Sequence, residues 1–175
     1  MSTIATLEVL REFLLEKVTP TIKLQKANDT NIREYELVSP QVHIGWIPPK
    51  GYLTEGMEST IPCLIVGMED GSDDGQSSDI NIRISAAIFS PGLHEPKGDR
   101  VKYTPDFQGY IDLMNLIDRT KAELLKNPII KNSFSVQESV KWGMYQDQPY
   151  PYWYGWITFS IKKQAYSRSE ILKNL

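Results

Sequence analysis

The sequence predicts a single α+β domain over residues 1–175, with a small, mostly antiparallel β-sheet packed by an N-terminal and a central helix. Two segments carry apolar residues at helical spacing, and several shorter segments alternate or run continuously as strands do. A hydrophobic fraction of 41% and a charged fraction of 23% are ordinary for a globular protein of this length. A chain of this size can bury an adequate core without disulfides. We also expect no cofactor.

Residues 4–18 are expected to form the N-terminal helix, with Ser2 or Thr3 capping its start and Pro20 following its end. Its main apolar stripe consists of Ile4, Leu7, Leu10, Leu14 and Val18. Val9 and Phe13 fall nearly opposite that stripe. A helix that is apolar on two sides is either buried twice or contacts a partner, so Phe13 is a candidate interface residue.

The middle of the chain predicts extended structure and a long hairpin. Extended segments are expected at 35–37 and 42–47, before a proline pair. Residues 61–68 form a continuous apolar run, which indicates a strand buried on both faces. Residues 80–88 alternate as a strand buried on one face does. Residues 69–79 would join these two strands as an acidic tip rich in glycine and serine.

The second half predicts the central helix and two further strands. A turn-rich loop at 91–103 leads to Thr104, an N-cap candidate followed by Pro105, and the helix runs to about Lys126. Its apolar face is expected to contain Tyr110, Leu113, Met114, Ile117, Leu124 and Leu125. Strands are expected at 136–144 and 157–161, with a turn between them. A short helix is predicted from Ser167.

The charge distribution is uneven. Residues 51–82 contain seven acidic residues and no Lys or Arg, so this segment carries −7 and the remainder, by difference from the net −3, carries +4. This asymmetry allows head-to-tail attraction between copies, with Asp70, Asp73 and Asp74 as candidate contacts, or it marks a solvated loop. A pI near 5.5 and the lack of a dense basic cluster argue against nucleic-acid recognition.

No segment resembles a signal peptide, and none approaches the length of apolar sequence that a membrane span needs. The sequence therefore predicts a soluble protein without membrane contact. The single cysteine, Cys63, lies in the apolar run and is expected to be an inert core thiol.

The sequence does not predict an enzyme or a metal site. Asp70 to Gly75 matches the opening of a calcium loop, but Asn81 stands where the loop needs a bidentate glutamate. His43 and His94 are far apart and belong to no spaced metal motif. Neither a nucleophile elbow nor a phosphate-binding glycine loop is present.

The most informative feature is the aromatic segment 150–156, YPYWYGW. Assigning Ile157, Phe159 and Ile161 to the core face places Tyr154 and Trp156 on the other face of the last strand. Their cover is either a helix of the same chain or a neighbouring subunit. Trp46 also has two interpretations: it either covers the core or anchors an interface. In a third interpretation, Tyr152, Trp153 and Trp156 surround a small-molecule pocket.

Four segments together resemble phage and prophage tail-terminator, or tail-completion, proteins. They are HIGWIPPKG (43–51), IPCLIVGMEDGSDDG (61–75), GYIDLMNLIDRTKAELL (109–125) and PYPYWYGWITFSI (149–161). The resemblance implies a compact domain with helices packed on a small sheet. It also implies a ring, commonly a hexamer, that caps the tail tube and joins it to the head connector.

The same resemblance implies assembly in the host cytoplasm and a final place in the tail or neck of the virion. The expected partners are further copies of the chain, the tail tube protein and head–tail connector proteins. The family supplies no catalytic residues. A neighbouring neck or tail-completion protein remains an alternative within the same resemblance.

Overall fold

The computed structural model describes residues 1–28, 30–31, 34–46, 60–98, 100–137 and 139–165. In chain order the elements are α1 (Thr3–Lys17), η1 (Thr19–Thr21), β1 (Leu24–Gln25), β2 (Leu37–Val38), β3 (Gln41–Ile44), β4 (Cys63–Asp73), β5 (Ser77–Phe89), β6 (Leu93–Lys97), β7 (Arg100–Thr104), α2 (Gln108–Lys126), β8 (Ile129–Ile130), β9 (Phe134–Val136), β10 (Lys141–Met144) and β11 (Tyr152–Gln164).

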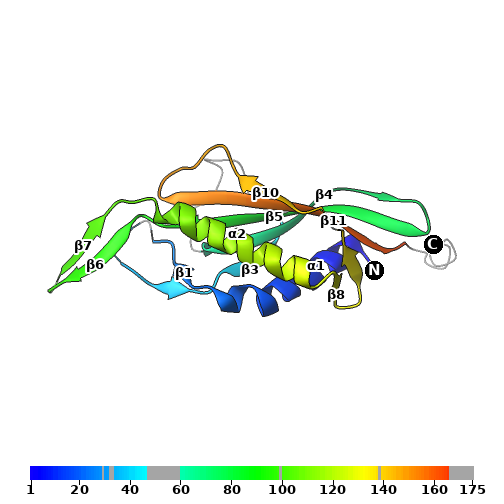
Figure 1. The fold of residues 1–175 in the computed structure, drawn as a ribbon, viewed down its shortest axis with the longest axis horizontal. Coiled ribbons are helices and arrows are strands. Elements are labelled where there is room, and N and C mark those ends of the chain that lie inside the picture. The colour runs from blue at the N-terminus through cyan, green and yellow to red at the C-terminus, as the bar shows by residue number, and fades with distance from the viewer. Residues whose placement is uncertain (29, 32–33, 47–59, 99, 138, 166–175) are drawn as a thin grey trace.

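A seven-stranded sheet organises the fold, in the order β3-β4-β5-β11-β9-β8, with β10 also pairing β11. All of its pairings are antiparallel except β3 with β4. The strand pair β6–β7 extends from one end of the molecule, and the β4–β5 hairpin extends from the other (Figure 1). The predicted α+β class, with a mostly antiparallel sheet and two packing helices, is therefore confirmed.

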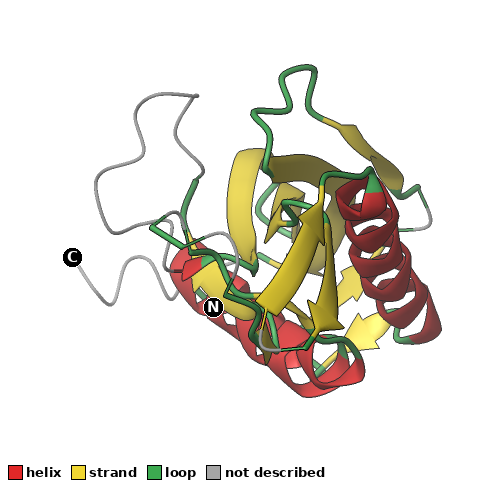
Figure 2. Cartoon of the chain, turned by 90° about the vertical axis from the view of Figure 1, so that its left-hand side faces the viewer, coloured by secondary structure: helices red, strands yellow, loops and turns green. Residues whose placement is uncertain are grey.

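Both helices lie on one side of the curled sheet (Figure 2). The main core forms where α1 and α2 meet the inward residues of β4, β5 and β11. Alternation on β11 is as predicted, because Ile157, Phe159 and Ile161 are all buried. The side of the sheet that faces away from the helices is called the outer face below.

The N-terminal helix has the predicted cap, since the Ser2 hydroxyl accepts a hydrogen bond from the Ala5 backbone N–H at 3.2 Å. Its burial differs from the predicted stripe. Ile4 is 59% exposed, whereas Phe13 is 4% exposed and belongs to the main core. The helix is buried over a wide arc, so the assignment of Phe13 to an interface is corrected: the chain itself covers it.

The central helix begins at Gln108, four residues after the predicted cap at Thr104, which belongs to β7. The Asp106 carboxylate accepts a hydrogen bond from the Gln108 backbone N–H at 2.9 Å. Leu113 and Leu124 are buried as predicted, but Tyr110 and Leu125 are about half exposed. The apolar arc of this helix is wider than the surface that the sheet covers.

The predicted hairpin is present, but residues 69–79 do not form a loop. Strand β4 continues to Asp73 and β5 begins at Ser77, and β11 pairs with β5 as far as that residue. Only residues 74–76 connect the two strands. Gly75 adopts a φ of +82°, a left-handed conformation that suits glycine in short hairpin loops.

Other differences concern short elements. The segment predicted as a loop at 91–103 contains the β6–β7 pair, and the strand predicted at 136–144 is divided into β9 and β10. Short strands of this kind carry too few alternating residues for periodicity to identify them. The helix predicted from Ser167 and the proline pair after Trp46 lie outside the described residues.

Candidate functional site

The candidate site lies on the outer face, where β5, β10 and β11 are adjacent. Trp156 of β11 is paired with Ser85 of β5 on one side and with Gly143 of β10 on the other. The indole of Trp156 occupies the space that a side chain at position 143 would need, because a Cβ there would lie 2.9 Å from it. Trp156 itself remains partly exposed.

Arg83 is the centre of the polar contacts beside Trp156. Its guanidinium carbon lies 5.4 Å from the Trp156 ring centroid, and its Nε donates to Glu69 at 2.6 Å. Burial disfavours the charged guanidinium, but hydrogen bonds to Glu69 and Tyr145 outweigh it and raise the pKa of Arg83. The Tyr145 and Ser85 hydroxyls are 2.8 Å apart. Trp156 therefore sits within a satisfied polar rim.

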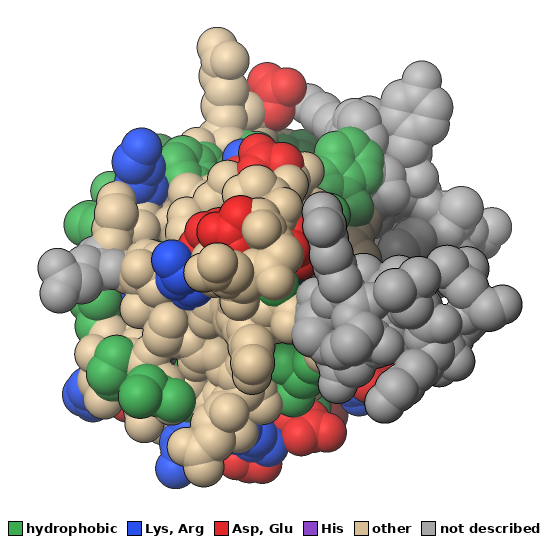
Figure 3. All heavy atoms as spheres, turned by 90° about the vertical axis from the view of Figure 1, so that its right-hand side faces the viewer, with side chains coloured by type: hydrophobic (Ala, Val, Ile, Leu, Met, Phe, Trp, Pro, Cys, Tyr) green, Lys and Arg blue, Asp and Glu red, His purple; other side chains and the backbone are tan. Residues whose placement is uncertain are grey.

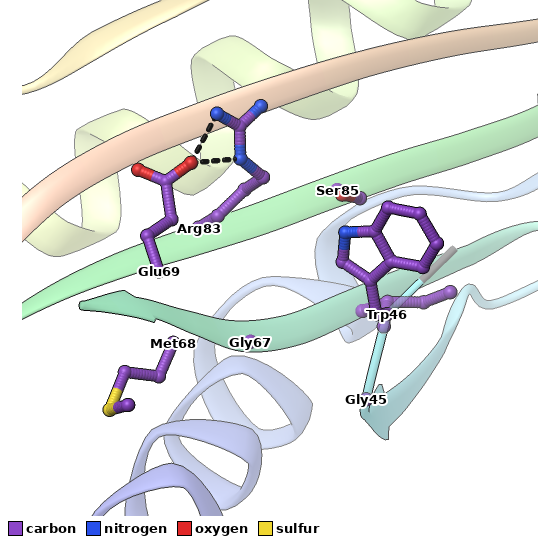
Figure 4. Close-up of a pocket in the computed structure, with 8 residues that line it drawn as sticks. Gly45, Trp46, Gly67, Met68, Glu69, Arg83 and Ser85 are labelled. Atoms are coloured by element: carbon purple, nitrogen blue, oxygen red, sulfur yellow. Dashed lines mark hydrogen bonds and ion pairs between the residues drawn. The ribbon is translucent and has the colours of Figure 1, made fainter. Parts of the chain in front are cut away.

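A cleft of about 320 Å³ opens next to this cluster. Its lining consists of Gly45, Trp46, Ile65, Gly67, Met68, Glu69, Arg83 and Ser85. The Trp46 indole extends along one side of it toward Ser85, while Arg83 and Glu69 are joined at the other (Figure 4). Trp46 is 67% exposed, so it borders the cleft and does not seal the core.

Tyr154 lies on the outer face as predicted, but it packs against a second, smaller cluster. That cluster consists of Ile61, Cys63, Ala87 and Phe89. Tyr152 joins the same cluster and stacks on Tyr154 at a centroid distance of 6.4 Å. Trp153 points to the helix side, where Gly109 of α2 packs on its indole. A pocket formed jointly by Tyr152, Trp153 and Trp156 is therefore excluded, because Trp153 is on the opposite face.

The acidic residues of the hairpin are exposed at its end, beside Lys and Arg side chains (Figure 3). Asp70 accepts a hydrogen bond from the Asn81 side chain at 2.5 Å, and Asp73 accepts one from the Gly75 backbone N–H at 2.8 Å. Asp74 accepts from the backbone N–H groups of residues 76 and 77 at 2.8 and 2.7 Å. The segment that matches a calcium-loop opening is thus extended strand and turn.

Cys63, His43 and His94 lie on three different strands, β4, β3 and β6. Cys63 is 1% exposed, and burial raises the pKa of its thiol to about 12, as an inert core thiol requires. His43 is on β3, whereas His94 is on β6 with Nδ1 3.0 Å from the Gly92 carbonyl oxygen. Within the described part of the chain, no group of three His, Cys, Asp or Glu side chains is arranged to hold a metal ion.

The structure thus brings Trp46 and Trp156 to opposite sides of Arg83, and places Tyr154 farther along the same face. Sequence reasoning missed Arg83, Glu69 and Tyr145. Tyr145 reaches Ser85 through the pairing of β11 with β10 and with β5. The contact between Arg83 and Glu69 depends on the register between β4 and β5, which shifts between Met68 and Asp70. A bulge of this kind has no clear signature in a single sequence.

Comparison with known protein families finds no family model that matches the chain, and comparison with curated proteins finds no match. Among the described residues, no helix is both long and apolar enough to cross a membrane.

Proposed function

We propose that this chain is a structural assembly protein of the tail-terminator type, which forms a ring, with a hexamer as the expected size, that caps a phage tail tube and joins it to the head connector. The observation that carries the proposal is Trp156, a partly exposed tryptophan on the outer face within a polar rim. The ring and its partners are inferred from the sequence resemblance to tail-terminator proteins.

The composition of the outer face supports a protein contact. Interface centres are enriched in Trp, Tyr and Arg, and a polar rim excludes water around them. Trp156, Trp46 and Arg83 are close together here, and their polar neighbours are paired within the chain. Docking against this surface would bury aromatic area without leaving unpaired charges.

The two ends of the molecule are different, which suits a ring. Successive subunits of a cyclic ring meet through two different surfaces, and the contact closes by rotation. Here the acidic hairpin end lies opposite the β6–β7 end (Figure 1). In the proposed role the copies assemble in the host cytoplasm and become part of the tail or neck of the virion.

The main experiment compares native masses of the wild type and Trp156→Ala. We expect the wild type to give a discrete multiple of 20.0 kDa that corresponds to a ring, and the variant to remain folded but fail to form that ring. Thr158→Ala, on the same face of β11, is the matched control and should assemble normally. A Trp156→Ala protein with the wild-type mass would reject this contact surface, and electron micrographs with tail tubes test the capping role.

Salt dependence tests the electrostatic part of the proposal. If exposed acidic residues at the hairpin end meet basic residues of a neighbour, association weakens as salt rises, because the Debye length falls to roughly 3 Å at about 1 M salt. Association that is insensitive to salt would assign the contact to apolar side chains.

A second candidate function is small-molecule binding in the cleft beside Trp46. A volume of about 320 Å³ is at the lower end of the range for ligand pockets. Quenching of Trp46 fluorescence by a ligand, lost in Trp46→Phe while native assembly persists, would favour this function. A neighbouring neck or tail-completion protein is the alternative within the assembly class, and the choice depends on whether the purified protein caps tubes.

A further inference from the structure

A second apolar surface lies on the helix side of the molecule, away from the outer face. Five large apolar side chains of α2, its N-cap position and β10 are about half exposed or more: Phe107 at 81%, Tyr110 at 48%, Ile111 at 51%, Leu125 at 56% and Trp142 at 51%. We call these five residues the flank stripe. Monomeric proteins seldom leave so many large apolar side chains exposed on one surface.

The helical residues of the flank stripe lie along one side of α2, in two groups separated by Asp118 and Lys121. Positions 107, 111, 114, 118, 121 and 125 are spaced by three or four residues, which keeps them on one side of a helix. Strand β10 borders that side, because Lys121 Nζ lies 3.3 Å from the Trp142 ring centroid. Met114 and Met144 are partly buried against the main core and belong to the same two elements. This side of the helix is therefore apolar near its two ends, carries the Asp118–Lys121 ion pair between them, and lies next to the edge strand.

The charges next to the flank stripe are paired within the chain. Lys121 is largely buried, lies on the Trp142 ring and bonds to Asp118 at 2.8 Å. A partner that docks here therefore needs no complementary charge at the centre. This favours burial of apolar area as the source of affinity, with aromatic and methionine side chains at the centre, as is common in protein interfaces.

The edge of β10 narrows the choice of partner. The Tyr145 backbone N–H donates to Tyr154 across the β10–β11 pair, so the backbone N–H groups of Trp142 and Met144 point away from β11. Within the described residues, no backbone hydrogen bond satisfies these outward groups. An extended segment of another chain can pair with them. Two identical edge strands that pair antiparallel are related by a two-fold axis, so this edge complements its own copy.

The exposed area is of the size that such a contact needs. Large apolar side chains bury roughly 150–250 Å² each, so five that are about half exposed offer on the order of 500 Å². A standard interface buries about 800 Å² on each partner. The difference would have to come from the polar side chains around the stripe and from the paired β10 edges, because Met114 and Met144 are partly buried against the core.

We infer that the flank stripe and the β10 edge form a two-fold contact surface for a second copy of this chain. This contact uses the exposed side of α2 and the outward edge of β10, whereas the proposed ring uses the outer face around Trp156; the two surfaces are neighbours, because Gly143 of β10 lies against the Trp156 indole. The chain would then associate in pairs whether or not the outer face completes a ring.

The test is the concentration dependence of native mass for two double variants. Phe107→Glu with Leu125→Glu places two charges on the flank stripe, whereas Gln108→Glu with Arg119→Glu places two on exposed positions of the same helix about 100–120° away from it. We expect the first to raise the concentration needed for pairing by at least about tenfold, and the control to change it by about twofold or less. Melting temperatures establish that both double variants are folded. If the double variant of the flank stripe does not fold, Trp142→Gln replaces it in the test.

A wild type that stays monomeric at tens of micromolar overturns the inference, and so does a flank-stripe variant that pairs as the control does. Trp156→Ala separates this inference from the ring. Pairs that persist in Trp156→Ala and are lost in the flank-stripe variant support the inference. Monomers from Trp156→Ala at concentrations where the wild type associates reject it. A Trp156→Ala protein with unchanged assembly rejects the ring surface alone.

Discussion

The two sides of β11 have different roles although they belong to the same thirteen residues. Toward the helices, Ile157, Phe159 and Ile161 are at most 3% exposed. Toward the outer face, Trp156 and Thr158 are partly exposed. The inner side chains fix the position of the strand, and the outer ones are free to form a contact surface. One alternating pattern thus specifies a buried side that packs the core and a partly exposed side, to which the proposed contact surface belongs.

The largest predicted effect separates these two sides. Phe159→Ala should lower the free energy of unfolding by ~3–5 kcal/mol, because it leaves a cavity in the main core. Trp156→Ala should lower the free energy of unfolding by about 1 kcal/mol, because the Trp156 side chain is partly exposed and the variant loses mainly its contact with Arg83. Urea unfolding of the two variants measures both values.

This prediction has a clear failure. If Trp156→Ala destabilises the chain as much as Phe159→Ala does, then Trp156 is a core residue and the contact surface lies elsewhere. Thr158→Ala on the outer side of the same strand provides the baseline for a small effect.

A second prediction tests how tightly the inner side is packed. Gly109 is the second residue of α2, and a Cβ at that position would lie 2.0 Å from the Trp153 indole nitrogen. Gly109→Ala should therefore destabilise the chain by ~1–3 kcal/mol, despite the better helix propensity of alanine. Gly143→Ala meets the Trp156 indole on the outer side, where a partly exposed ring can move, so its effect should be smaller. Thermal melts of the two variants compare the two sides directly.

The sequence predicts the inner side of the sheet better than the outer side. Alternation identified the buried residues of β5 and β11, and the Ser2 cap was identified from its residue type. These signals are local, because each depends on residues within a few positions of one another. The predicted ends of the two hairpin strands are wrong. Residues 69–73 are mostly polar, and they belong to a strand because they pair with β5, which a local pattern does not reveal.

The candidate site was predicted in part. Alternation placed Trp156 and Tyr154 on the outer face, but it could not show that Tyr154 packs on a second cluster with Phe89. The grouping of Arg83, Glu69 and Tyr145 requires the cross-strand register of β4, β5, β11 and β10. The exposure of Tyr110 and Leu125 depends on how much of α2 the sheet covers, which periodicity does not measure.

A third prediction concerns the hairpin end, where neither helix covers the strands. Gly75→Ala should cost about 1 kcal/mol, because its left-handed conformation is unfavourable for a residue with a Cβ. No atom lies within 4 Å of that Cβ, so steric crowding adds nothing. The loss should be smaller than that of Gly109→Ala, and no loss at all would indicate that the turn changes its conformation. Deleting residues 69–79 is expected to be more costly than removing a loop, since buried Ser78 belongs to that segment.

The smallest effect is expected for an ion-pair cluster that lies on neither side of β11. Lys131 bonds to Glu12 at 2.9 Å and to Glu16 at 2.8 Å, joining α1 to the turn between β8 and β9. These groups are exposed, so screening by solvent leaves Lys131→Met only slightly less stable than the wild type.

The pH dependence of that small difference can be derived from the two shifted groups. The hydrogen bond from Lys131 lowers the pKa of Glu16 below its ordinary value of 4.5, so its contribution is present above that pH and is lost as pH falls through the folded-state pKa. The hydrogen bonds to Glu16 and Glu12 raise the pKa of Lys131 above 10.5, so its contribution is present below that pH and is lost as pH rises through the folded-state pKa. The difference between the wild type and Lys131→Met should therefore be widest between these limits and should narrow in acid. Urea midpoints at pH 7 and pH 3 (roughly on either side of the lower limit) measure it, and a gap that widens in acid would mean that the lysine stabilises the turn by its packing alone.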